Sequence, residues 1–177
     1  MSTGKELQEQ GLQLFREGAY PEAAEIFAKA RDAFQVEDNM SMAGEMLNNL
    51  GVIYIKQGLH EEALTALDEA RSLFQEVGDR EREMQVVGNM GDLYAALDDV
   101  EQATTCYRQA ADAWEEMDDD DRYGRTLMAL GEMQFKKGIR KEGLATYQVG
   151  LGKIKDPTFR QRMILKLREL QAKLLGG

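Results

Sequence analysis

The sequence predicts an all-α protein, a right-handed superhelix of four helical hairpins followed by a C-terminal capping helix. Good helix formers dominate the 177 residues, and only Pro21 and Pro157 interrupt them. Similar residues also recur every 40 positions, starting with Gly11, Gly51, Gly91 and Gly131. Because a helical hairpin cannot bury its apolar face alone, this period predicts hairpins that stack on one another.

The four repeats are predicted at residues 4–43, 44–83, 84–123 and 124–153, within a single domain over residues 1–177. Inside each repeat the apolar residues have helical spacing on both sides of a central turn. In the first two repeats this turn falls at Gly18 and Gly58, where a helix ends in a residue that tolerates positive φ. Pro21 is placed to begin the second helix of the first repeat. Each repeat is therefore predicted to be a helical hairpin.

The fourth repeat departs from the pattern of the other three. Gln134 stands where the second and third repeats have tyrosine, and Gly143 and Gly150 replace alanines. Because these changes remove side chains that would fill the space between the paired helices, we expect this hairpin to be the looser one.

A different segment follows Lys153. It starts a helix at Pro157, has an apolar stripe of helical spacing, and predicts a capping helix over residues 157–175. Residues 153–177 hold seven basic and two acidic residues, whereas residues 1–152 hold 15 basic and 30 acidic ones. The charge is therefore strongly asymmetric along the chain.

Composition argues against several classes of function. The net charge of −10 opposes binding to nucleic-acid phosphates, and no apolar stretch approaches the roughly 20 residues that a membrane span needs. Cys106 is the only cysteine, so it forms no disulfide within the chain. We expect a protein of the cytoplasm that neither inserts into membranes nor binds nucleic acid.

Few residues of the sequence are suited to catalysis. His60 and Cys106 lie in different repeats, and the sequence has neither a phosphate-binding glycine loop nor zinc-ligand spacing. We therefore expect no enzyme, no cofactor and no metal site, with His60 at the surface or at a helix cap and Cys106 in the core. The acidic run Asp118 to Asp121 predicts a helix start, and a cation site is the alternative interpretation.

The repeat carries a recognisable set of small and large residues. Those of the second unit, Gly51, Tyr54, Ala63, Leu67 and Ala70, match the signature of the tetratricopeptide repeat family, which the chain resembles over about residues 4–153. The 40-residue unit resembles the extended repeats of kinesin light chain and of Leu-Gly-Asn-repeat G-protein-signalling modulators. The resemblance implies a solenoid in which the first helix of each hairpin lines a concave, peptide-binding groove.

The resemblance also implies which side chains face that groove. Carried over position by position, the candidate binding residues are Phe15, Asn48, Asn49, Val52, Ile55, Lys56, Gln85, Asn89, Asp92, Arg125, Glu132 and Phe135. Asn49 and Asn89 occupy the same position in successive repeats, and a side-chain amide can bond to the backbone of an extended peptide. The alternative is that both are ordinary polar residues on an exposed helix face.

We therefore predict a non-enzymatic scaffold or adaptor that binds a peptide or helix of a protein partner in the groove. One alternative is self-assembly into a homo-oligomer, through the basic C-terminal helix or the ends of the solenoid. A small-molecule or peptide sensor is the third hypothesis.

Overall fold

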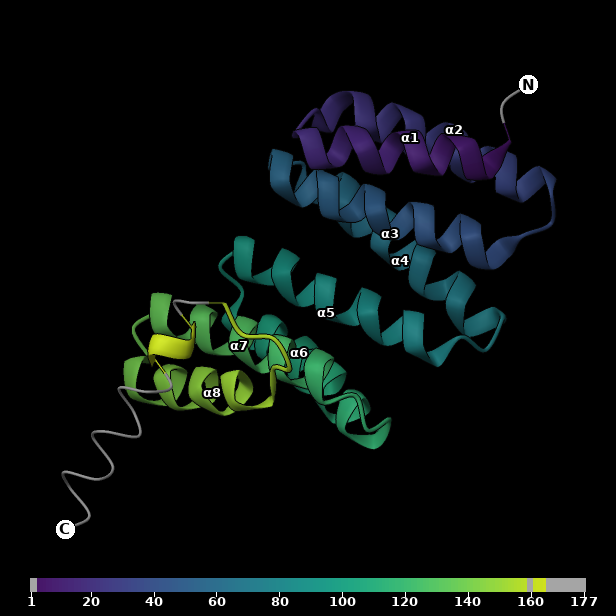
Figure 1. Cartoon of the computed structure of the whole chain (residues 1–177). Coiled ribbons are helices and arrows are strands. Elements are labelled where there is room, and N and C mark those ends of the chain that lie inside the picture. The colour runs from purple at the N-terminus through teal and green to yellow at the C-terminus, as the bar shows by residue number, and fades with distance from the viewer. Residues whose placement is uncertain (1–2, 159–160, 165–177) are drawn as a thin grey trace, which may run out of the picture. The chain divides into compact units, whose positions relative to one another are not determined.

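The computed structural model describes residues 3–158 and 161–164, and Figure 1 shows a succession of antiparallel helices. No strand occurs among these residues, so the prediction of an all-α fold is confirmed. The helices are α1 (Gly4–Glu17), α2 (Tyr20–Val36), α3 (Met40–Gln57), α4 (His60–Glu76), α5 (Arg80–Ala96), α6 (Val100–Glu116), α7 (Asp120–Lys136) and α8 (Arg140–Lys153).

The predicted capping helix is only partly covered by the described residues. Residues 161–164 are helical, whereas 157 and 158 are not. Residues 159–160 and 165–175 of the predicted helix lie outside the described residues. None of the described helices is both long enough and apolar enough to span a membrane.

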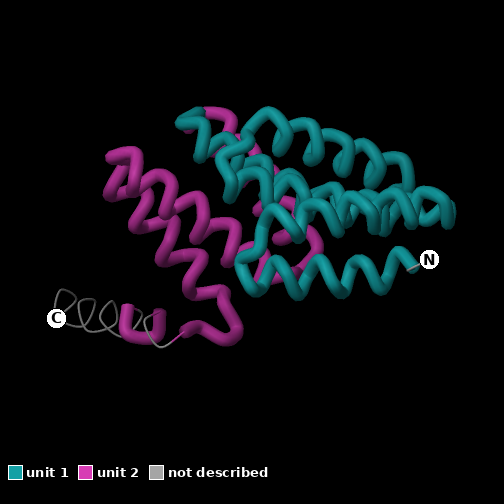
Figure 2. Tube along the Cα trace, turned by 90° about the horizontal axis from the view of Figure 1, so that it is seen from above, with its two compact units in different colours: residues 1–99 teal, residues 100–177 magenta. Residues whose placement is uncertain are grey.

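The chain divides into two compact units, coloured separately in Figure 2. Unit 1 comprises residues 1–99 and holds α1 to α5, and unit 2 comprises residues 100–177 and holds α6 to α8. In unit 1, α1 packs on α2 and α3 on α4, while α2 also contacts α3 and α4 contacts α5. In unit 2, α7 contacts both α6 and α8. The single domain over residues 1–177 stays a prediction.

A residue with positive φ follows each helix from α1 to α7. The residues are spaced by 20, half of the sequence repeat: Gly18, Asp38, Gly58, Gly78, Asp98, Asp118 and Gly138. The helix ends predicted at Gly18 and Gly58 are confirmed, with φ of 80° and 75°. The 20-residue spacing is hidden in the sequence because three of the seven positions are aspartate, which adopts this conformation less readily than glycine.

The helices that open the second, third and fourth repeats begin with a side-chain cap. Asn39, Asp79 and Asp119 accept hydrogen bonds from the backbone N–H groups of Met42, Arg82 and Arg122, at 3.2, 3.0 and 3.0 Å. These bonds satisfy amides that have no partner in the first turn of a helix. As a result α3, α5 and α7 start at residues 40, 80 and 120, about one turn before the predicted repeat boundaries.

Small residues allow close packing inside the hairpins of unit 1. A Cβ on Gly11 would lie 2.8 Å from the Phe27 ring, and a Cβ on Gly51 would lie 2.6 Å from Leu67. Phe27 and Leu67 are themselves fully buried. The large side chain of one helix therefore occupies the space that glycine leaves on the other.

The expectation of a loose fourth hairpin is wrong. A Cβ on Gly131 would lie 2.6 Å from the carbonyl oxygen of Gly143, and a Cβ on Gly124 would lie 2.5 Å from that of Gly150. These glycines face one another in two pairs, so the backbones of α7 and α8 meet directly. The glycines that replace alanine close the gap between the helices instead of opening it.

Candidate functional site

Side-chain contacts join α1, α3 and α5, which are the first helices of the first three repeats. Gln8 on α1 donates through Nε2 to Oε1 of Glu45 on α3, at 2.8 Å. Arg82 on α5 donates to Oγ of Ser41 on α3 at 3.1 Å and lies 3.6 Å from Oε2 of Glu45. The helices predicted to line a binding face are thus linked from α1 to α5 by polar side chains.

On α5 this series of contacts ends in an ion pair. Arg82 lies 2.6 Å from the Asp79 carboxylate, which also caps the helix. Burial of the Asp79 carboxyl raises its pKa. Hydrogen bonds from the backbone and side chain of Arg82 lower the pKa by more, so the pKa of Asp79 lies below its ordinary value. The hydrogen bond to Asp79 likewise raises the pKa of Arg82, so both groups are charged at neutral pH.

The predicted asparagines have different environments. Asn89 on α5 donates through Nδ2 to Oδ1 of Asn48 on α3 at 2.7 Å, and Asn48 is only 4% exposed. Asn49 is half-buried, and its side chain has no hydrogen bond to any residue that the structure describes. Asn48 therefore belongs to the packing between repeats, whereas the Asn49 amide is available to a partner.

An aromatic and cationic cluster lies at the other end of α1 and α3. The rings of Phe15 and Tyr20 pack with their centroids 5.6 Å apart and their planes tilted by 58°. The Nζ atom of Lys56 lies 6.0 Å from the centroid of each ring. The structure thus brings together two predicted residues, Phe15 and Lys56, and adds Tyr20, which the sequence analysis did not single out.

The remaining candidates of unit 1 lie between and beside these groups. Val52 and Ile55 on α3 are half-buried, while Gln85 and Asp92 on α5 are exposed. Asn49, Val52 and Lys56 are spaced by three and four residues, so they share one side of α3. This side therefore combines a free amide, an apolar centre and a cation.

Unit 2 carries the three other candidates, all on α7. Phe135 is 50% exposed and lines, with Glu132, Lys136, Leu144 and Tyr147, a hollow of about 280 Å³ between α7 and α8. Arg125 is exposed and pairs with Asp121 at 2.6 Å, and this bond lowers the pKa of the Asp121 carboxyl. Unit 2 thus brings Glu132 and Phe135 together, and Arg125 stands apart from them.

The acidic run and the lone histidine and cysteine have structural positions. Asp119 caps α7, and Asp120 pairs with Lys153 at 2.9 Å, so the predicted helix start is confirmed. No group of metal-ligating side chains that could hold an ion occurs among the described residues. Cys106 is buried and forms no disulfide, as expected. His60 is the first residue of α4, and its Nδ1 is buried without a hydrogen bond.

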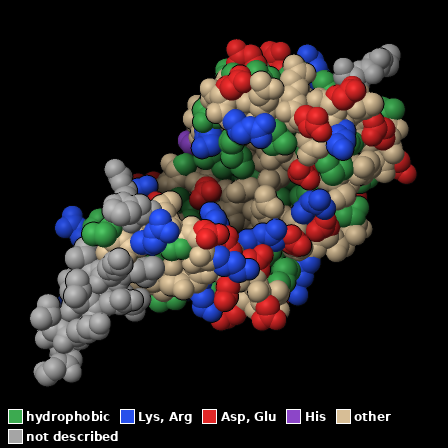
Figure 3. All heavy atoms as spheres, viewed as in Figure 1, with side chains coloured by type: hydrophobic (Ala, Val, Ile, Leu, Met, Phe, Trp, Pro, Cys, Tyr) green, Lys and Arg blue, Asp and Glu red, His purple; other side chains and the backbone are tan. Residues whose placement is uncertain are grey.

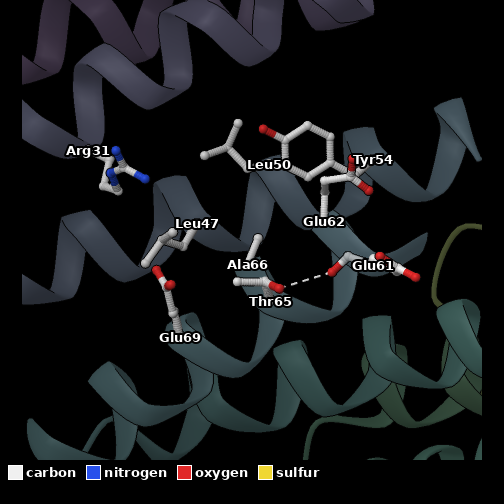
Figure 4. Close-up of a pocket in the computed structure, with 9 residues that line it drawn as sticks. All are labelled: Arg31, Leu47, Leu50, Tyr54, Glu61, Glu62, Thr65, Ala66 and Glu69. Atoms are coloured by element: carbon white, nitrogen blue, oxygen red, sulfur yellow. Dashed lines mark hydrogen bonds between the residues drawn. The ribbon is translucent and has the colours of Figure 1, made fainter. Parts of the chain in front are cut away.

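A second hollow lies in unit 1 (Figure 4), and the sequence analysis did not predict it. It measures about 450 Å³ and is lined by Arg31, Leu47, Leu50, Tyr54, Glu61, Glu62, Thr65, Ala66 and Glu69, from α2, α3 and α4. One feature of the sequence could have indicated this acidic hollow. Glu62 and Glu69 are replaced by Gln102 and Gln109 one repeat later, so the acidic rim is particular to the second repeat.

With this geometry in place, comparison with known proteins identifies the repeat. Residues 42–116, from α3 to α6, match the tetratricopeptide repeat family. These residues are similar to tetratricopeptide repeats. The predicted family is thereby confirmed. None of the curated proteins matches the sequence.

Solved structures of other tetratricopeptide-like repeat proteins share the fold. The structure of BtubC (BKLC) from P. vanneervenii matches with a TM-score of 0.67 at 20% identity, over 94% of this chain and 64% of that one. This chain thus spans less than two thirds of the length of BtubC. A Podosopora anserina protein named as a kinesin light chain, with nearly identical TPR-like repeats, matches with a TM-score of 0.53 at 13% identity, over 86% of this chain and 97% of that one.

Proposed function

We propose that this protein is a non-enzymatic scaffold or adaptor of the cytoplasm, which binds a peptide or helix of a protein partner on the α1–α3–α5 face of unit 1. Tetratricopeptide repeats generally mediate protein–protein interactions. The observation that supports the proposal is the set of side-chain contacts across α1, α3 and α5, in which Lys56 lies over the Phe15 ring and Asn89 donates to Asn48.

The chemistry of this face suits a polypeptide better than a single small ligand. The Asn49 amide can both donate to and accept from a partner backbone, because none of its hydrogen-bonding groups is engaged by a described residue. Val52 and Ile55 supply apolar contact, and Lys56 supplies a cation beside two aromatic rings. Acidic, basic and hydrophobic side chains are interspersed in Figure 3, as in interfaces whose charges select the partner.

Unit 2 supplies a second contact in this proposal. The hollow beside Phe135 has walls of Leu144 and Tyr147, and both Phe135 and Leu144 are about half exposed. A large apolar side chain of the partner fits such a site, because exposed aromatic and aliphatic groups gain most from being covered.

The proposal is tested by affinity capture from a lysate of the source organism, with mass spectrometry of the captured proteins. The test variant is Asn49→Ala combined with Ile55→Ser, and the matched control is Gln35→Ala, on an exposed position of α2 outside the face. We expect a partner that the wild type and the control retain and that the test variant loses.

Equal capture by all three proteins would overturn recognition through this face. Circular dichroism of the test variant has to match that of the wild type, so that lost binding is not lost folding. The Asn89→Ala variant is unsuitable here, because it would leave the buried Asn48 oxygen without its partner.

A further inference from the structure

The hollow between α2, α3 and α4 lies on a different side of α3 from the face proposed above. An α-helix turns by about 100° per residue, which places Leu47, Leu50 and Tyr54 on a side of α3 roughly opposite to that of Asn49, Val52 and Lys56. In Figure 4 the side chains of Leu47, Leu50 and Tyr54 lie beside those of α4. A ligand in this hollow would therefore not compete directly with a partner on the opposite side.

The floor of the hollow is apolar and its rim is acidic. Leu47, Leu50 and Ala66 form the floor and are almost completely buried. The rim carries the carboxylates of Glu61, Glu62 and Glu69, all on exposed residues of α4. A space of about 450 Å³ is large enough for a long side chain and its neighbours.

The glutamates of the rim form no ion pairs within the part of the chain that the structure describes. Arg31 is the cation of the lining, and it is already engaged by Asp32 through two bonds, at 2.6 and 2.9 Å. Glu61, Glu62 and Glu69 line the hollow without an ion pair to any other described residue. Three carboxylates thus face one hollow without a positive partner.

We propose that this hollow is a second docking site, which takes a lysine or arginine side chain from a basic segment of a partner protein. Long basic side chains lay their methylene groups on apolar surface and keep the charged end at a polar rim. Here the methylenes lie on Leu47, Leu50 and Ala66, and the charged end meets the glutamates. Charge complementarity selects this occupant, because an acidic segment would be repelled by the same rim.

The acidic rim of this site occurs in the second repeat and not in the third. At the positions of Glu62 and Glu69 the third repeat has Gln102 and Gln109. The double variant Glu62→Gln, Glu69→Gln therefore gives α4 the rim residues that α6 already has, and we expect it to fold like the wild type. This variant removes the charge while keeping the size and the hydrogen-bonding groups of the side chains.

The test measures fluorescence anisotropy of a short labelled alanine–leucine peptide that carries two lysines, added to the full chain at low ionic strength. The matched control protein is Glu25→Gln, Asp68→Asn, which changes the net charge equally at exposed residues outside the hollow. We expect the rim variant to bind about tenfold more weakly than the wild type and the control variant to bind equally well. A peptide with glutamates in place of the lysines should not bind.

Three results would overturn the proposal. Equal weakening by both double variants would mean general attraction to an acidic chain, and equal binding of the glutamate peptide would exclude charge selection. Light scattering that shows self-association of the wild type, lost in the rim variant, would assign the site to a second copy of this chain. The Asn49→Ala, Ile55→Ser variant separates the two sites, since it should leave binding of the lysine peptide unchanged.

Discussion

Single residues at the ends of the helices adopt a backbone conformation that most side chains avoid. Gly78 has φ of 71°, and Asp38, at the same place one repeat earlier, has φ of 57°. Left-handed backbone is readily available to glycine but strained for residues with a Cβ, and aspartate tolerates it better than most. These residues let one helix follow another after a connection of two or three residues.

Gly78→Ala should lower the free energy of unfolding by about 1 kcal/mol, because the added Cβ is strained at positive φ even though nothing lies within 4 Å of it. Gly152→Ala is the matched control. It also meets open space but lies inside α8, where alanine is a better helix former than glycine. Urea unfolding followed by circular dichroism measures both, and equal effects of the two changes would contradict the strain.

Asp79 links the cap of α5 to the ion pair with Arg82. Asn39 already performs the same capping role one repeat earlier, so Asp79→Asn keeps the cap and removes the charge. At pH 7 we expect the variant to be less stable by about 0.5 kcal/mol, a modest value because the pair is partly exposed.

The pH dependence of this loss follows from the direction of the pKa shift. The pKa of Asp79 is lowered on folding, so ionisation stabilises the fold above the unfolded value of about 3.9. The contribution is lost as pH falls through the lower folded pKa, and the wild type and Asp79→Asn should then converge. Urea titrations between pH 7 and acid measure this, with the exposed Asp68→Asn as the control. A difference that stays constant with pH would contradict the assignment to charge.

At the scale of paired helices, the closest packing occurs where neither helix has a side chain. A Cβ on Gly143 would lie 2.6 Å from the backbone nitrogen of Phe135 and 2.7 Å from the carbonyl oxygen of Gly131. In contrast, a Cβ on Gly44 would lie 3.0 Å from the ring of Phe74, a side chain that can shift. Backbone cannot yield without moving a whole helix.

Gly143→Ala should therefore destabilise unit 2 by about 3 kcal/mol, at the upper end of the usual cost of overpacking. Gly44→Ala, the matched control in unit 1, should lose less than half as much. Thermal melting monitored by circular dichroism compares the two variants with the wild type. If Gly143→Ala melts like the wild type, α7 and α8 do not meet as closely as the structure shows.

The amide pair between α3 and α5 gives a second test at this scale. Asn89→Ala leaves Oδ1 of the buried Asn48 without its donor and should cost about 1–3 kcal/mol. Asn49→Ala removes an amide that has no partner among the described residues and should change stability by less than about 0.5 kcal/mol. Urea unfolding measures the loss of stability in both variants. Equal losses would mean that the two asparagines contribute alike to the fold and would contradict the prediction.

At the scale of the whole molecule, the chain consists of two compact units that divide after Asp99. Repeat arrays are stabilised mainly by contacts between neighbours, so a run of successive helices can keep its structure when the rest is absent. Unit 1 contains five helices. Both proposed binding sites lie in it, namely the α1–α3–α5 face and the hollow between α2, α3 and α4.

We expect residues 1–99, produced alone, to remain helical and to unfold cooperatively in urea. Far-ultraviolet circular dichroism measures both properties, and residues 1–59, which end before α4, serve as a control that should be less stable. A fragment of residues 1–99 without a cooperative transition would show that unit 1 depends on α6 to α8.

The architecture of the repeats follows from local features of the sequence. The 40-residue period, the apolar spacing and the turns at Gly18 and Gly58 predict the order of helices that the structure has. They do so because helix formation and helix ending depend on residues close together in the chain.

The roles of individual side chains depend instead on how the helices pack. Asn48 and Asn49 are adjacent in sequence, but one turns toward α5 and is buried while the other stays available. Gly143 suggested a gap and instead lets two backbones meet, and the acidic hollow needs residues from α2, α3 and α4. Such outcomes depend on how neighbouring helices are rotated, and a difference of one residue turns a side chain by about 100°.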